Sequence, residues 1–152
     1  MKLVNESIED VLKPKTKEKI LADIGGRDDA TFKKSRKPIN GTYGIGEVNI
    51  SYDNLVKLFG EPQEKYGDFD DYDKVSTRWV VEDENGRVYT IYDWKATYDM
   101  LPSQFRSLSS YEWHIGGIQT KEEEERERAK PLIFMLKKDG AEDLVRYIYK
   151  NI

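Results

Sequence analysis

The alternation of apolar and polar residues predicts a strand and a helix near the middle of the chain. Residues 42–50 begin among glycines, which indicate a bulged or closely approached strand. They then alternate as Glu47-Val48-Asn49-Ile50, with the two-residue period of a strand that buries one face. Ser51 is a favoured N-cap and Gly60 a favoured helix stop, so the apolar residues between them predict a helix over 52–59.

The longest β-rich stretch, residues 74–95 (KVSTRWVVEDENGRVYTIYDWK), predicts a β-hairpin. Its centre is Asn85-Gly86, a pair that tolerates the positive φ angles of a two-residue type I′ turn. Such a turn fixes the register, and the resulting cross-strand pairs are Glu84 with Arg87, Val80 with Ile91, Trp79 with Tyr92 and Arg78 with Asp93. Two of these pairs join opposite charges, which favours this register.

Further elements extend the pattern toward both ends of the chain. Residues 111–115 predict another strand, which ends at Gly116-Gly117. Capping residues and apolar spacing predict helices over 8–12, 16–24 and 141–152, and a charged helix that begins at Thr120. We therefore expect an α+β fold, with an antiparallel sheet of about four strands and helices packed on one face. The single domain (1–152) would consist of N-terminal helices and a basic loop (1–40), a sheet-bearing core (42–117) and C-terminal helices (118–152).

Composition limits what the chain can do. Its 152 residues are enough for one domain. The absence of cysteine excludes disulfides, thiolate zinc sites and a cysteine nucleophile. A net charge of −4 gives no general attraction for nucleic acid. No apolar run reaches membrane-spanning length and the N-terminus lacks the apolar region of a secretion signal, so we expect no membrane association and a cytoplasmic location.

Aromatic residues are numerous, and ten tyrosines against five phenylalanines suit partly exposed positions. The predicted helices are too few to bury both faces of the sheet, so some rings on its strands should be accessible. We therefore expect a surface that binds a protein or another ligand, formed by Tyr89, Tyr92, Trp94, Trp113 and His114.

His114 is the only histidine and therefore the main candidate for acid-base chemistry. A single histidine, without cysteine and without a carboxylate at ligand spacing, favours a structural role over a metal site. We expect its ring to pack beside the hairpin aromatics and to form a hydrogen bond, with no metal and no cofactor. A small hydrolase centred on His114 and Asp93 remains an open alternative.

Two charged segments resemble ligand sites. The first has the spacing of a calcium loop and consists of Asp68, Asp70, Asp71 and Asp73. Asp73 and Trp79 occupy the positions where that motif requires Gly and Glu, so we expect a solvated acidic loop. The second is a basic cluster of Lys33, Lys34, Arg36 and Lys37. Phosphate contacts from these residues, with Tyr43 for stacking, give the alternative of a nucleotide or nucleic-acid binding protein.

Three segments, ISYDNLVKLFGEP, RWVVEDENGRVYTIYDWK and EWHIGG, resemble a group of small proteins from tailed phages and large DNA viruses. The resemblance covers residues 48–117 and leaves the basic loop and the C-terminal helices outside. It implies a viral origin, but the group has no assigned activity. More distantly, a helix followed by FGEP and a Trp-bearing hairpin is similar to the small protein-binding α+β modules of β-lactamase inhibitor proteins and related lipoproteins.

These observations favour a non-enzymatic viral accessory protein that binds a host or viral protein through an aromatic sheet surface. The chain lacks a recognisable catalytic motif, has an excess of aromatic residues and segregates its charges into blocks. Inhibition of a host defence is one role that such a protein could have. We expect it in the cytoplasm of the host cell, with the virion as the alternative location. The sequence indicates neither the partner nor the oligomeric state.

Overall fold

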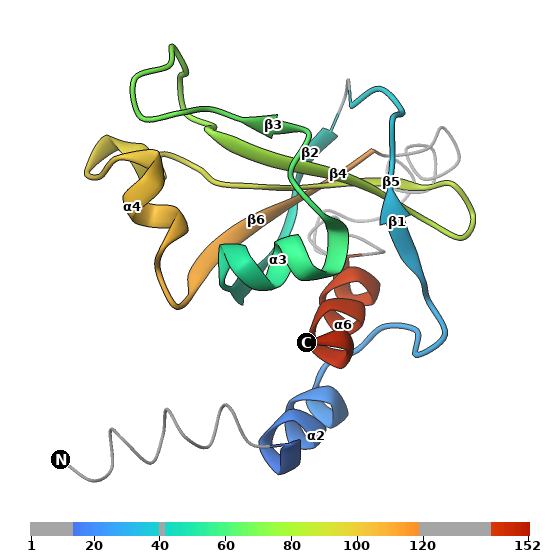
Figure 1. The fold of residues 1–152 in the computed structure, drawn as a ribbon. Coiled ribbons are helices and arrows are strands. Elements are labelled where there is room, and N and C mark those ends of the chain that lie inside the picture. The colour runs from blue at the N-terminus through green and yellow to red at the C-terminus, as the bar shows by residue number, and fades with distance from the viewer. Residues whose placement is uncertain (1–13, 40–41, 119–140) are drawn as a thin grey trace, which may run out of the picture.

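The computed structural model describes residues 14–39, 42–118 and 141–152 (Figure 1). The helices are α2 (Pro14–Asp23), α3 (Tyr52–Phe59), α4 (Pro102–Arg106) and α6 (Ala141–Asn151), with a 3-10 turn η1 (Ala96–Tyr98). The strands are β1 (Phe32–Lys34), β2 (Thr42–Ile50), β3 (Glu64–Lys65), β4 (Thr77–Asp83), β5 (Val88–Tyr92) and β6 (Tyr111–Ile118). The predicted α+β fold is therefore confirmed. The helices predicted over 8–12 and from Thr120 lie outside the described residues.

The strands form one antiparallel six-stranded sheet in the order β1-β4-β5-β6-β2, with β3 also paired to β4. The two strands beyond the predicted four are β1 and β3, short segments that both lie along the free edge of β4. Between them the Gln63 side chain takes the place of a strand residue, because its amide donates to the Val80 carbonyl (2.7 Å) and accepts from the Val80 N–H (2.9 Å). None of the helices in the described ranges is long and apolar enough to cross a membrane.

The hairpin register differs by one residue from the predicted one. β4 pairs with β5 so that Arg78 lies opposite Tyr92 and Trp79 lies opposite Ile91. Successive residues of a strand point to opposite faces of the sheet. A register shift of one residue therefore places the side chain of a predicted partner on the opposite face. The predicted pairing of Arg78 with Asp93 is therefore wrong.

The cause of the shifted register is the turn. The Gly86 N–H donates to the Asp83 carbonyl (3.0 Å), and the Asp83 N–H donates to the Arg87 carbonyl (2.9 Å). Only Gly86 in this turn has a positive φ, of 81°, so the turn is a type I turn followed by a glycine bulge rather than type I′. The Asp83 side chain favours it by accepting from the N–H groups of Asn85 and Arg87, both at 2.9 Å.

The core lies between one face of the sheet and the helices α3 and α6 (Figure 1). Its centre is the edge-to-face pair of Trp79 and Trp113, whose ring centroids are 5.2 Å apart. The Trp113 indole N–H donates to the Ile50 carbonyl before α3 (2.9 Å), and that of Trp79 donates to the Gly60 carbonyl after it (2.8 Å). The two tryptophans therefore hold both ends of α3 on the sheet. As predicted, the Ser51 hydroxyl caps α3, accepting from the Asn54 N–H (3.1 Å).

Candidate functional site

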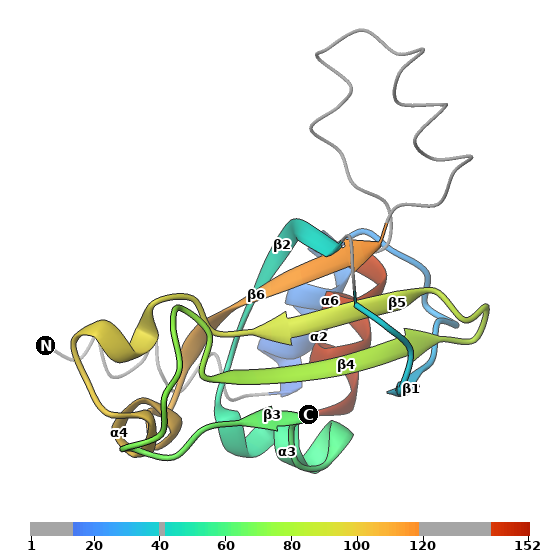
Figure 2. The same ribbon diagram turned by 90° about the horizontal axis from the view of Figure 1, so that it is seen from above.

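The face of the sheet opposite α3 and α6 is not covered by any described helix (Figure 2), and we refer to it as the open face. A row of polar side chains runs across the strands on the open face. The strands β3, β4, β5, β6 and β2 contribute one side chain each. In that order the row consists of Glu64, Arg78, Tyr92, His114 and Glu47, each paired with the next in the strand register. We refer to these five residues as the polar row.

Contacts within the polar row fix the orientation of its rings. Arg78 forms a bidentate ion pair with Glu64 at 2.9 and 3.0 Å, and its guanidinium lies 5.9 Å from the centre of the Tyr92 ring. The His114 ring stacks on Tyr92, with centroids 5.7 Å apart and an interplanar angle of 26°. This packing beside a hairpin aromatic confirms one part of the prediction for His114. The predicted hydrogen bond is not observed, since the ring forms none within the described residues.

The β2 side of the open face carries two neighbouring carboxyl groups. Glu47 lies opposite His114, and Glu112 is two residues earlier on the same strand as His114. A hydrogen bond from the protonated Glu112 to the Glu47 carboxylate, together with repulsion between the two charges, raises the pKa of Glu112. This side of the open face is therefore acidic and next to the histidine.

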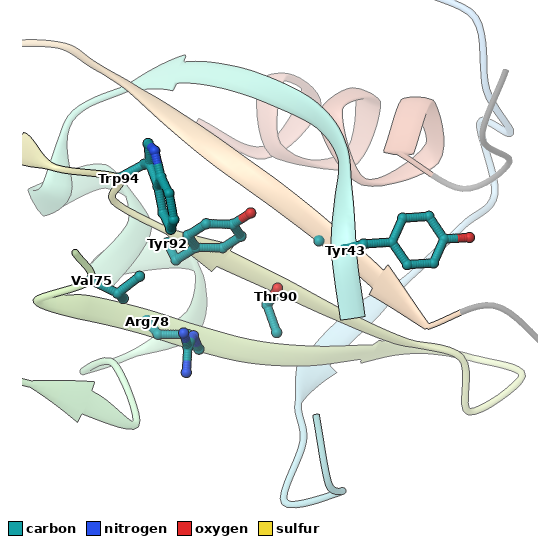
Figure 3. A pocket seen from close by; sticks show the side chains of 7 residues that line it. Tyr43, Val75, Arg78, Thr90, Tyr92 and Trp94 are labelled. Atoms are coloured by element: carbon teal, nitrogen blue, oxygen red, sulfur yellow. The ribbon is translucent and has the colours of Figure 1, made fainter. Parts of the chain in front are cut away.

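A cavity of about 150 Å³ opens beside the polar row. It is lined by Tyr43, Val75, Arg78, Thr90, Tyr92, Trp94 and Gly116. Figure 3 shows the rings of Tyr92 and Trp94 side by side on one side of the sheet, whereas the Tyr43 ring points away from them. Gly116 leaves room at the base of the cavity, because a Cβ at this position would collide with the Thr90 hydroxyl.

Trp94 lies at the end of the open face, where its side chain is 44% exposed. Two lysines contact its ring, with the Lys74 Nζ 5.6 Å and the Lys95 Nζ 5.9 Å from its centre. The lysines are held close together because the Lys95 N–H donates to the Lys74 carbonyl at 2.8 Å. Lys95 adopts the left-handed conformation with φ of 56°, which supports this local turn. Neither lysine forms an ion pair with a described residue.

The five residues predicted to form one binding surface are divided between the two faces of the sheet. Tyr92, Trp94 and His114 lie on the open face, and the expectation that some of the hairpin aromatics are accessible is confirmed by Trp94, which lies two residues beyond β5. Tyr89 and Trp113 are only 1% and 0% exposed and belong to the core, so including them in a binding surface was wrong. Burial raises the pKa of Tyr89 to about 12. Strand alternation explains the division, because Tyr89 and Tyr92 are three residues apart and must point to opposite faces.

The pairing of His114 with Asp93 in a hydrolase is also wrong. Tyr92 lies opposite His114 on the open face, so the next residue, Asp93, points into the protein. Its carboxylate accepts hydrogen bonds from the backbone N–H groups of Ser76 and Thr77, both at 2.8 Å, and from the Ser76 hydroxyl at 2.9 Å. Burial raises the pKa of Asp93, and these hydrogen bonds partly offset the effect. Asp93 thus secures the start of β4.

The basic cluster is partly neutralised by β4 and its turn. Lys37 pairs with Glu82 at 2.8 Å and donates to the Gly86 carbonyl at 2.9 Å. This contact lowers the pKa of Glu82. Lys33, Lys34 and Arg36 are exposed, and the first two belong to β1 rather than to the predicted loop.

The acidic loop has a structural role in the fold. Both carboxylate oxygens of Asp68 accept hydrogen bonds from Ser103, one from the N–H (2.8 Å) and one from the hydroxyl (2.7 Å), which ties the loop to α4. Asp70 accepts from the Gly67 N–H. The part of the chain that the structure describes contains no group of three or more His, Asp or Glu side chains arranged to hold a metal ion.

The sequence did not point to several residues of the open face. Arg78 and Glu47 were visible as polar positions in alternating strands, but the register was needed to place them in one row with His114. The lysines around Trp94 gave no signal, since Lys74 and Lys95 are 21 residues apart and meet only through the hairpin.

Comparisons with known proteins add no family assignment. No protein-family model matches the chain, and no curated protein matches it. The viral resemblance of the three sequence segments is therefore still a prediction.

Proposed function

We propose that the chain is a non-enzymatic accessory protein that binds a partner protein through its open face. The observation that carries the proposal is the group of Tyr92, Trp94 and His114, which point outward from the surface that no described helix covers. Tyrosine and tryptophan are enriched among the residues that dominate binding energy at protein interfaces. The resemblance of residues 48–117 to viral proteins supports a viral origin, and inhibition of a host defence in the host cytoplasm is part of the proposal.

The geometry favours binding because the half-buried rings of Tyr92 and His114 are already held in place by their neighbours. His114 stacks on Tyr92, Tyr92 contacts Arg78, and Arg78 is fixed by Glu64. All four side chains project from paired strands, so little side-chain entropy would be lost when a partner covers them. A hydrolytic role finds less support, because the carboxylate predicted to orient His114 lies on the other face.

The test is affinity capture with the tagged chain from host cells, followed by quantitative mass spectrometry. We expect Tyr92→Ala to reduce capture of a specific protein at least tenfold, since hot-spot truncations cost about 2 kcal/mol or more. Ile152→Ala is the control, because Ile152 is an exposed apolar residue outside the polar row. A partner captured equally by wild type and Tyr92→Ala would contradict the proposal.

The nucleic-acid alternative makes a different electrostatic prediction. Phosphate contacts by Lys33, Lys34 and Arg36 would release counterions, so binding would weaken steeply with salt. Salt-dependent binding of an oligonucleotide that is lost when these three residues are neutralised, and retained in Tyr92→Ala, would favour this alternative over protein binding.

A further inference from the structure

The largest exposed apolar side chains are concentrated at one end of the molecule. Six described residues form this group, and five of them belong either to the segment between β3 and β4 or to the segment between β5 and β6. These five are Phe69, Trp94, Tyr98, Leu101 and Leu108. Both segments lie at the same end of the sheet (Figures 1 and 2), which we refer to as the aromatic end. Several exposed apolar side chains gathered at one end of a protein favour an interaction site there.

One part of the aromatic end projects into solvent. Phe69 is 95% exposed and sits in the acidic loop. The loop is not free to fold the ring back, because Asp68 on one side is bound to Ser103 and Asp70 on the other binds the Gly67 N–H. Asp71 is exposed and forms no ion pair with a described residue. The loop therefore presents an aromatic ring with negative charge beside it.

The cavity of the open face borders the aromatic end at Trp94 and has positive charge at its rim. The cavity beside Trp94 and Tyr92 has a volume of about 150 Å³. Its walls are mixed, with the Tyr92 and Trp94 rings on the aromatic side and Arg78 and Thr90 on the polar side. Its aromatic walls suit edge-to-face or offset contact with another ring. Lys74 and Lys95 flank Trp94 without a carboxylate partner in the described chain, so they supply unneutralised positive charge at the rim.

A surface that carries both a projection and its matching recess is self-complementary. Two copies related by a twofold axis can satisfy such a surface, since each copy offers its projection to the other and receives one in return. We propose that two copies of this chain associate through the aromatic end, with Phe69 of each copy entering the cavity beside Trp94 of the other. The acidic loop then lies against the lysine pair of the partner copy.

The contact is a small one, and this determines its strength. A loop entering a cavity covers less surface than the roughly 1,000 Å² expected of a stable specific interface, so the dimer is weak and concentration-dependent. Because opposite charges meet at an exposed rim, salt weakens it. The self-association and the proposed partner binding share Tyr92 and Trp94, so the dimer competes with the partner. Phe69→Ala therefore separates the two, since it removes the dimer and leaves the open face intact.

Sedimentation equilibrium from micromolar to near-millimolar concentration tests the inference. Wild type is expected to show a monomer–dimer equilibrium that weakens with added salt. Phe69→Ala and Trp94→Ala are each expected to remain monomeric, whereas Ile152→Ala, which removes an exposed apolar side chain away from the aromatic end, retains the equilibrium. A wild-type chain that stays monomeric throughout the range would overturn the inference, as would a dimer that survives in Phe69→Ala.

A mixing experiment identifies which surfaces meet. Phe69→Ala keeps an intact cavity and Trp94→Ala keeps its Phe69, so an equimolar mixture restores one of the two contacts that each variant lacks alone. We expect the mixture to contain a heterodimer weaker than the wild-type dimer. A mixture that remains monomeric while wild type forms a dimer would show that Phe69 does not enter this cavity, and would overturn the inference.

Discussion

On the helix-covered face of the sheet, Trp79 and Trp113 are fully buried, and each indole N–H donates to a backbone carbonyl that flanks α3. On the open face, Trp94 is 44% exposed and its ring is contacted by two lysines instead of by a core. The same residue type therefore has two different uses in one sheet. The difference is set by strand parity and by the position of the helices, and aromatic content alone does not reveal it.

The same contrast holds for two carboxylates of the sheet region, Asp93 after β5 and Glu47 on β2. Asp93 points into the covered face and is held by Ser76 and Thr77. Glu47 points outward beside His114 and shares its surroundings with Glu112. On the covered face, the carboxylate is hydrogen-bonded within the fold and stabilises it. On the open face, the carboxylate is available for contact with another molecule.

Truncation of a core tryptophan should give the largest effect. Trp79→Ala removes a fully buried ring and the hydrogen bond to Gly60, so we expect it to lower the free energy of unfolding by about 3–5 kcal/mol. Urea denaturation followed by circular dichroism measures this change. A decrease in the free energy of unfolding below about 1 kcal/mol, the typical cost of an ordinary substitution, would contradict the proposed division between the faces.

Asp93 offers a smaller, pH-dependent test of the covered face. Burial raises its pKa above the ordinary value of 3.8, so the folded chain binds this proton more tightly than the unfolded chain does. Its contribution to stability is therefore fully present below pH 3.8 and is lost as the pH rises through the folded pKa. Asp93→Asn cannot lose a proton and should not show this loss.

The measurement is the difference in unfolding free energy between wild type and Asp93→Asn across the acid range. Subtraction is needed because other carboxylates act in the opposite direction. Arg27, for example, lowers the pKa of Glu84 to about 2, which removes stability as the pH falls through that value. A difference that stays constant with pH would contradict the burial effect at Asp93.

The fold could be predicted from the sequence where local signals are strong. The Ser51 cap and the Gly60 stop define α3, and alternation in 42–50 marks β2 with its glycine bulge. Strands β1 and β3 could not be predicted, because they have three and two residues and depend on pairing with β4. The hairpin was located correctly, but Asp83 was overlooked as the residue that favours a three-residue turn.

The candidate site could be predicted only in part, for the same reason. Residues 88–92 (VYTIY) contain apolar or aromatic side chains on both faces of the strand. The sequence therefore does not reveal which set of alternate residues is buried. Tyr92, Trp94 and His114 were identified as surface candidates together with two residues of the core. The polar row and the lysines at Trp94 depend on the register and on tertiary contacts, which no local pattern encodes.

The most direct test of the division between the faces measures stability and partner capture on the same Trp94→Ala protein. The ring is exposed and outside the core, so we expect the free energy of unfolding to change by no more than about 0.5 kcal/mol. Capture of the partner should fall at least tenfold, as for a hot-spot residue. A variant that unfolds as easily as Trp79→Ala, or one that captures the partner as well as wild type, would contradict the account.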